Sequence, residues 1–275
     1  VSDSNTYLWN LKGGESVSNG DTLTFNGSSN PTVAGNISYA GNIVTSSQTG
    51  SSMTFTGDIQ AESFKVAHYY GRIHMAGNEL AVNKLWVGAG GGYDNSLYGA
   101  LDLDSGNVTT AGQVRLAELG HGVLNVNQGS SLTVSGSNDT HSTSASFLLA
   151  HWAYSGELNL RGGSLTALST SMRLSWDGTG TFNASSGTAD LLGMSFWASG
   201  NGSFRGSFLL GGATSGDARV NIGSSGITDV AGAAVIKLGE GTLGALSNWS
   251  IGYNPNFTPS YVELLGTVNG TILDT

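Results

Sequence analysis

The sequence predicts an all-β, single-domain parallel β-solenoid, a chain wound into stacked coils of about 22–24 residues with atypical capping ends. Three observations lead to this prediction. The composition is rich in glycine and poor in charge, a glycine-led motif recurs at nearly regular spacing, and polar and apolar residues alternate with the period of two that is typical of strands.

The composition excludes several other classes of protein. The 275 residues include 43 glycines, 3 prolines and no cysteine, with only 10 basic and 19 acidic side chains. A helical bundle or coiled coil needs far more Glu, Lys, Arg and Ala, collagen needs Gly at every third position, and a disulfide scaffold needs cysteines. The hydrophobic share of 39% is too high for a disordered chain.

A glycine-led motif forms the first half of each repeat. It begins with Gly and any residue, continues with Leu or Phe and alternating residues, and closes on another Gly, as in GVLNVNQG and GELNLRGG. Its copies start at Gly99, Gly122, Gly156, Gly180 and Gly202. The steps between these starts are close to one predicted coil, except for the longer step from Gly122 to Gly156, which fits one repeat plus an inserted loop.

A short apolar run forms the second half of each repeat, at residues 114–119, 147–152, 172–176 and 194–198. Each repeat therefore predicts about three short strands, which suits one coil of a solenoid. Stacked coils bury like side chains in columns, and glycine is needed where the chain turns with positive φ or where coils approach closely. Stacking also explains the low content of charged residues, because like charges on adjacent coils repel one another whereas Ser, Thr and Asn side chains do not.

The predicted organisation has three parts. Residues 1–84 are expected to form an N-terminal cap and irregular β coils, and residues 85–230 the regular repeats, with an inserted polar loop at 136–145. Residues 231–275 are expected to be C-terminal capping strands that cover the last exposed edge. All three prolines lie outside the regular repeats, because proline cannot donate to a strand ladder.

The charge pattern and the first residues of the chain indicate which binding partners and which cellular location to expect. A net charge of −9, with the basic residues thinly spread, predicts no binding to nucleic acid or to anionic membrane surfaces. No apolar run approaches the roughly 18–20 residues of a transmembrane segment, so none is expected. The chain opens Val-Ser-Asp-Ser-Asn without an initiator Met, which favours a secreted protein whose signal peptide has been removed, or a shortened chain.

The repeats resemble those of autotransporter passengers, and most of all the autotransporter-associated β-strand repeat proteins that often end in a PEP-CTERM sorting signal. The likeness rests on GVLNVNQGSSLTV, GELNLRGGSLTA and the LSW or FWA that follows, and covers residues 85–265. The closing NWSIGYNPNF and YVELLG are also similar to the end of such passengers. The resemblance implies a right-handed β-helix, secretion and exposure at a bacterial surface.

The histidines give no signature of a metal site, since none belongs to an HExxH motif or a similar pair of ligands. We expect each of them to be exposed or hydrogen-bonded. They are His68, His74, His121, His141 and His151.

Asp102 and Asp104 lie on one face of a predicted strand, and carboxylate oxygens are suitable calcium ligands. A calcium-binding solenoid repeats its Asp on every coil, whereas the next copy of this motif carries Asn125 and Asn127 instead. We therefore predict that the two aspartates lie on a solvated strand face. The sequence predicts no metal-binding, cofactor-binding or catalytic residue, and ligand-binding residues are left unassigned.

A glycan-cleaving β-helix enzyme would place two or three carboxylates, or carboxylates with Arg or Lys, on adjacent coils. Stacking the repeats predicts one column made of Arg115, Phe147, Arg173 and Ser195. Asp177 falls one strand later and Asp190 in the next coil. No acidic cluster is expected to span neighbouring coils, so the protein is predicted not to be an enzyme.

The tryptophans are open to two interpretations. Exposed, they would form a platform on which sugar rings stack, whereas buried they would fill the core. Five of the six recur near strand ends, at Trp86, Trp152, Trp176, Trp197 and Trp249. The middle three follow one another at nearly the spacing of one repeat, which favours a buried or half-buried column.

Together these features predict a non-enzymatic, extracellular or cell-surface solenoid with a structural or adhesive role. Its expected partners are copies of itself, in a fibre or surface layer, or surface glycans. Two alternatives stay open, a carbohydrate-binding module and a polysaccharide lyase or glycoside hydrolase.

Overall fold

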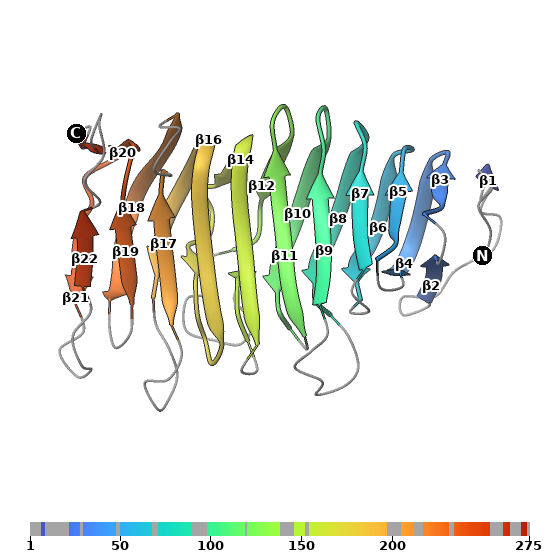
Figure 1. Ribbon diagram of the computed structural model, residues 1–275, viewed down its shortest axis with the longest axis horizontal. Helices are drawn as coiled ribbons and strands as arrows, with labels where there is room; N and C mark the ends of the chain where they lie inside the picture. The colour runs from blue at the N-terminus through green and yellow to red at the C-terminus, as the bar shows by residue number, and fades with distance from the viewer. Residues whose placement is uncertain are drawn as a thin grey trace.

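The chain winds into a parallel β-solenoid, drawn in Figure 1 with its long axis horizontal and its two ends at opposite sides. The 23 strands found among the described residues belong to one hydrogen-bonded network, and their pairings are parallel. The part of the chain that is described below contains no helix, and so none long and apolar enough to cross a membrane. The computed structural model describes residues 7–8, 22–27, 30–47, 50–67, 71–89, 98–118, 120–137, 146–151, 154–196, 205–211, 217–230, 234–253, 261–264 and 271–273.

Each coil contributes a strand to three faces in turn, named face 1, face 2 and face 3 in chain order. Long strands such as β14 and β16 bend from one face to the next through shifts of register. The same three faces continue from β4 to β20, across the predicted boundaries at residues 84 and 230. Most of residues 1–21 and 254–275, which were predicted to form caps, lie outside the described part.

The strands of each face stack on those of neighbouring coils. Face 1 consists of β1 (Tyr7–Leu8), β3 (Thr32–Ala34), β5 (Ser52–Phe55), β7 (Gly71–Met75), β9 (Tyr98–Leu103), β11 (His121–Asn127), the first part of β14 (Ser155–Ala167), the first part of β16 (Thr179–Ser195), β17 (Gly206–Leu210), β19 (Val235–Leu238) and β22 (Tyr261–Leu264). Face 2 consists of the first parts of β4 (Ile37–Ser47), β6 (Ile59–Val66), β8 (Glu79–Val87) and β10 (Val108–Leu116), then β12 (Ser131–Val134), later parts of β14 and β16, the first part of β18 (Ala218–Val230), β20 (Gly241–Ala245) and β23 (Thr271–Leu273). Face 3 consists of β2 (Thr22–Gly27), the second parts of β4, β6, β8 and β10, β13 (Phe147–Leu148), β15 (Met172–Arg173), the ends of β16 and β18, and β21 (Ile251–Tyr253).

The length of a coil varies along the solenoid. Asp102 pairs with Asn125, which pairs with Asn159, which pairs with Asn183, so these three coils contain 23, 34 and 24 residues. The predicted coil length is confirmed for the first and the last of the three. The middle one is the coil in which an inserted loop was predicted, and residues 138–145 of that loop lie outside the described part. The coil that leads from Ser52 to Arg72 is shorter than predicted.

The core is a set of apolar columns that run along the solenoid axis between the three faces. In face 1, one column consists of Leu101, Leu124, Leu158, Phe182 and Phe208, which pair in register and are fully buried. The rings of its last two members stack 5.6 Å apart. Burial of each such side chain contributes about 1.5–3 kcal/mol, so the regular stacking of like residues stabilises every coil through its neighbours.

The glycines that begin the motif form a column of their own. Those at 99, 122, 156, 180 and 206 pair with one another in register at the start of the face 1 strands, so the last copy starts at Gly206 and not at the predicted Gly202. They were predicted to mark coil corners, and they do follow the corner between faces 3 and 1. Close approach is the reason rather than positive φ, because a Cβ at Gly156 would lie 1.5 Å from the carbonyl oxygen of Leu149. Gly180 meets the carbonyl oxygen of Leu174 at the same distance.

A different set of glycines turns the corner between faces 1 and 2. These residues have φ between 70° and 92°, the left-handed region that glycine adopts without a steric penalty. They are Gly35, Gly77, Gly106, Gly129, Gly162, Gly187 and Gly211. The abundance of glycine therefore has two physical causes at two corners of the same coil.

The substitution Gly180→Ala tests the close approach at the glycine column. Because the added methyl would overlap the Leu174 carbonyl, we expect the free energy of unfolding to fall by about 1–3 kcal/mol or more. Gly252→Ala is the matched control, since a Cβ there would meet no atom nearer than 3.8 Å. Urea unfolding of both variants measures the difference. Equal stability of the two variants would contradict the proposed role of the glycine column.

Candidate functional site

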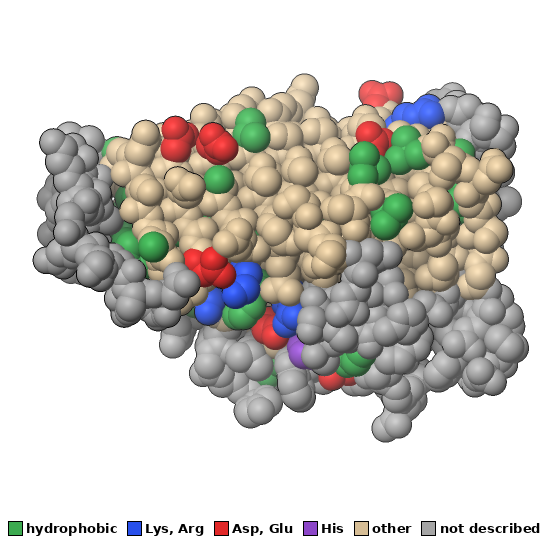
Figure 2. Space-filling model, turned by 180° about the vertical axis from the view of Figure 1, so that it is seen from behind, with side chains coloured by type: hydrophobic (Ala, Val, Ile, Leu, Met, Phe, Trp, Pro, Cys, Tyr) green, Lys and Arg blue, Asp and Glu red, His purple; other side chains and the backbone are tan. Residues whose placement is uncertain are grey.

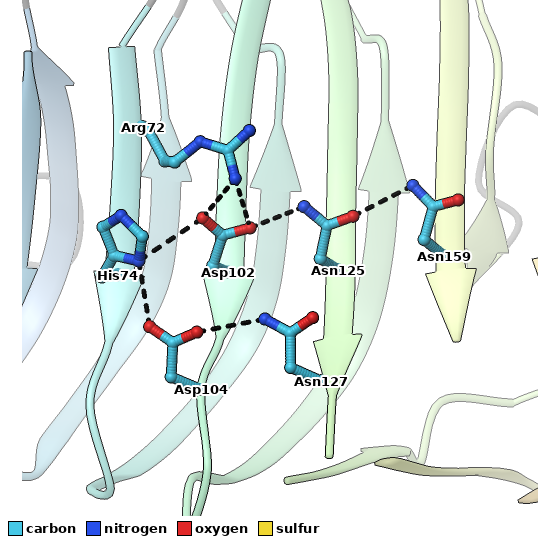
Figure 3. A network of polar contacts seen from close by, with 7 residues as sticks. All are labelled: Arg72, His74, Asp102, Asp104, Asn125, Asn127 and Asn159. Atoms are coloured by element: carbon cyan, nitrogen blue, oxygen red, sulfur yellow. Dashed lines mark hydrogen bonds and ion pairs between the residues drawn. The ribbon is translucent and has the colours of Figure 1, made fainter. Parts of the chain in front are cut away.

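The candidate site is a row of polar side chains on the outer side of face 1, shown in part in Figure 3. His74, Asp102, Asn125, Asn159 and Asn183 pair in register on β7, β9, β11, β14 and β16. Each lies between two inward-facing apolar residues of its strand, as in the LDL, LNV and LNL segments, and strand alternation therefore turns it outward. The repeated motif thus aligns one polar residue per coil.

The three asparagines form a directional chain of hydrogen bonds across the coils. The Nδ2 of Asn183 donates to Oδ1 of Asn159 at 3.2 Å, and Nδ2 of Asn159 donates to Oδ1 of Asn125 at 3.0 Å. The Nδ2 of Asn125 then donates to a carboxylate oxygen of Asp102 at 2.5 Å. Because all the amides point the same way and end on a charged acceptor, each bond polarises the next. We call this chain of contacts the amide ladder.

Arg72, His74 and a second aspartate complete the carboxylate end of the ladder. Arg72 Nη1 lies 2.7 and 3.0 Å from the two oxygens of Asp102, whose side chain is only 4% exposed. His74 Nδ1 lies 2.9 Å from Asp104 and 3.4 Å from Asp102. Asn127 donates to the other oxygen of Asp104 at 3.0 Å, so a second, shorter chain runs beside the amide ladder.

The electrostatics at this end favour the charged form of Arg72. Partial burial lowers the pKa of its guanidinium, but the carboxylate of Asp102 outweighs burial and the net shift is upward. Burial also raises the pKa of Tyr98 at the start of β9, where Arg72 opposes the shift and Glu157 adds to it. A cation paired with a nearly buried carboxylate and linked to neutral amides stabilises the stacking of coils.

The prediction that both aspartates lie on a solvated strand face is wrong for Asp102. That carboxylate is buried beneath its partners, because Arg72 from the coil before and Asn125 from the coil after close over it. Asp104 is half-exposed and fits the prediction better. Among the described residues, no group of three or more His, Cys, Asp or Glu side chains is arranged to hold a metal ion.

Arg72 and His74 were not assigned to a site by the sequence analysis. The signal that would have found them is the glycine-led motif itself, because GRIHM at β7 stacks residue for residue on GALDL at β9. The predicted copies of the motif start at Gly99, and residues 1–84 were assigned to a cap and irregular coils, so the coil that supplies Arg72 and His74 was not counted among the repeats.

A second polar cluster lies at the corner between faces 3 and 1. Arg115 Nη1 binds Glu118 at 2.9 Å, and buried His151 lies 3.4 Å from Glu118 and 4.0 Å from Asp177. Burial raises the pKa of Glu118, but its hydrogen bond to His151 and the charge of Arg115 lower it further, and the net shift is downward. Ala117, with φ of 54°, precedes Glu118 at this corner. One histidine therefore lies between carboxylates from the coil before and the coil after it, and no direct contact joins the two carboxylates among the described residues.

The predicted column of Arg115, Phe147, Arg173 and Ser195 is wrong by one residue. Arg115 pairs with Leu148, whereas Phe147 pairs with the buried residue before Arg115 and belongs to the core. A slip of one residue reverses the direction of every side chain, and the two residues of β13 show no alternation that would fix their register in the sequence. Arg173 and Ser195 do pair.

The remaining predicted residues have separate environments. His121 accepts a hydrogen bond from the backbone N–H of Ser155 and also contacts its hydroxyl, as predicted for a hydrogen-bonded histidine. Asp190 accepts a hydrogen bond from Asn221 at 2.7 Å in face 2, away from Asp177. The predicted positions His68 and His141 lie outside the described residues.

The described tryptophans, Trp86, Trp176 and Trp249, are half-buried. The ring of Trp86 lies 4.5 Å from Lys65 Nζ, and the ring of Trp176 lies 4.7 Å from the guanidinium of Arg173. Trp249 packs against the core. Intramolecular cations thus contact two of the rings that the platform interpretation would leave for sugars. The predicted positions Trp152 and Trp197 lie outside the described residues.

The substitution Asp102→Asn tests the amide ladder. An amide at this position would turn donor hydrogens toward donors from Arg72 and Asn125, so we expect a loss of about 1–3 kcal/mol of stability. Asp104→Asn makes the same chemical change at a half-exposed carboxylate and should cost less than about 1 kcal/mol. Thermal unfolding of both variants provides the measurement. A harmless Asp102→Asn would show that the amide ladder does not stabilise the fold.

In comparisons with known proteins, no family model, no curated protein and no solved structure matches this chain. The function proposed below therefore depends on the geometry of the described residues and on the sequence.

Proposed function

We propose that the protein is a non-enzymatic structural or adhesive element, a secreted β-solenoid displayed at a cell surface. One observation carries the proposal. The polar side chains that most resemble a functional site, at face 1, bind one another across the coils through the amide ladder. Residues that link neighbouring coils in this way stabilise a rod.

The geometry of Asp102 speaks against the alternative of a glycan-cleaving enzyme at face 1. Such enzymes need two carboxyl groups that flank a scissile bond and are open to the substrate. Arg72, His74 and Asn125 surround the Asp102 carboxylate, and little of its side chain meets solvent. A sugar oxygen has no free approach to that carboxylate.

The mechanical properties of a solenoid support a structural role. Each coil contacts only its neighbours, so stability accumulates along the axis from backbone ladders, apolar columns and the amide ladder. A low content of charged residues permits this stacking without repulsion between like side chains. We propose that the resemblance to autotransporter-associated β-strand repeat proteins reflects a shared architecture and a shared bacterial surface location.

The direction of the strands sets the geometry that self-assembly would have. The pairings are parallel, so a second copy that extended the ladders would stack head to tail. A head-to-tail interface uses two different surfaces and does not close on itself, which produces a filament rather than a dimer. Copies of the chain are therefore the first partner that we propose.

Electron microscopy of the purified chain tests this proposal. We expect straight rods that join end to end into filaments, with the mean length increasing as protein concentration rises. Gold-labelled antibody against the chain should mark the outside of intact source cells.

Two results would contradict the proposal. Isolated short rods at every concentration would exclude self-assembly, and antibody label confined to the cell interior would exclude a surface role. The variant Asp102→Asn serves as a comparison, because loss of the amide ladder should shorten or loosen the rods at temperatures where the original chain stays intact.

A further inference from the structure

Face 2 carries a row of outward-facing residues that differs in chemistry from the row on face 1. Six consecutive coils place an uncharged residue at the same register position of this row. These residues are Ser38, Gln60, Ala81, Thr110, Thr133 and Thr166. Figure 2 shows the side of the molecule opposite face 1 as a broad surface of uncharged groups, with charged side chains near its margins.

The hydroxyl groups of this row have no partner among the described residues. Those of Thr110, Thr133 and Thr166 form no hydrogen bond to any of them, although strand pairing sets them one coil apart. The spacing between paired strands is about 4.8 Å, which is too long for a direct bond between such short side chains. The asparagines of face 1 span the same spacing because their side chains are longer. Face 2 thus presents free donors and acceptors at a regular interval.

A shallow groove follows the first part of this row along the solenoid axis. One hollow of about 520 Å³ crosses β4, β6, β8 and β10, with Ser38, Gln60, Ala81 and Thr110 among its lining residues. A second hollow of about 350 Å³ has three of these lining residues in common and therefore adjoins the first. The concavity exists because small side chains such as Ala81 fill little of the space above the strands. Its direction, across successive coils, suits an extended chain molecule.

The margins of the groove select against negative charge. Asp58 and Glu79 line one hollow and Glu62 lines the other, while no Lys or Arg of the described part of the chain lines either of them. Hydrogen bonds from Asn83, and then from Lys84, lower the pKa of Glu62 and favour its ionised form. Lys84 Nζ lies 3.1 Å from Glu62 and offsets its charge, so a polyanion lying in the groove would be repelled mainly by Asp58 and Glu79. A neutral polyhydroxylated chain would find acceptors there.

We propose that face 2 binds a neutral polysaccharide that lies along the solenoid axis from β4 to β14. Gln60 and the three threonines would exchange hydrogen bonds with sugar hydroxyls, which supplies partners for groups that have none within the described chain. This inference rests on the proposed adhesive function, because it names the partner and the surface that adhesion uses. It assigns binding to uncharged polar groups instead of the tryptophans.

Affinity electrophoresis of the intact chain tests the inference. The gels contain a neutral polymer, either xyloglucan, galactomannan or a β-1,3-glucan, or an anionic polymer, either polygalacturonate or alginate. We expect slower migration with at least one neutral polymer and unchanged migration with the anionic ones. In the double variant Thr110→Arg, Thr133→Arg, two long side chains cover the row, and the apparent Kd should rise at least tenfold.

The matched control is Thr181→Arg, the same change at a half-exposed threonine in a strand of face 1. It should bind like the unchanged chain, and circular dichroism should show all variants folded. No retardation by any neutral polymer would overturn the inference, and so would equal retardation of the double variant or retardation by polyanions alone.

The result also separates this inference from the proposed function. Release of reducing sugar ends from a retarding polymer would overturn the non-enzymatic function while leaving face 2 as a binding surface. Filaments and surface label without retardation by any neutral polymer would overturn only the glycan inference.

Discussion

The structure depends on one constraint, the parallel and in-register pairing of each coil with the next. This pairing places equivalent positions of successive coils on top of one another. Each side chain must therefore be compatible with a similar side chain stacked directly against it. Glycine stacks on glycine where the corner from face 3 leaves no room for a Cβ, and leucine stacks on leucine or phenylalanine in the core. Asparagine suits repetition on the outside, because one amide both donates and accepts.

The same constraint gives the outer faces different roles. On face 1 the repeated side chains are long enough to reach each other, and the amide ladder ends on a carboxylate that Arg72 neutralises. On face 2 the repeated side chains are short, so the hydroxyls of Thr110, Thr133 and Thr166 stay available, and the first of these threonines also lines a shallow groove. One face contributes to cohesion between coils, and the other presents a regular polar surface.

The sequence predicted the solenoid because its motif is local, and each copy shows the alternation and glycines of one coil. It did not reveal contacts that depend on exact register. Phe147 was placed one position away from its true partner, because β13 contains only two residues and offers no alternation to align. The burial of Asp102 involves Arg72, which lies 30 positions earlier in the part of the chain predicted to form irregular coils. The cluster at Glu118, His151 and Asp177 brings together corners of different coils, for which no strand pattern exists.

Register is therefore the property to measure. Because the sequence contains no cysteine, any disulfide that forms must join the cysteines introduced by substitution. The double variant Thr133→Cys, Thr166→Cys joins positions that pair directly in face 2, where paired Cα atoms lie within disulfide range. The variant Thr133→Cys, Ala167→Cys shifts one partner by a single residue and turns its thiol into the core. Mild oxidation should consume the free thiols of the first variant and leave those of the second. Equal cross-linking in both variants would contradict the in-register stacking on which the account depends.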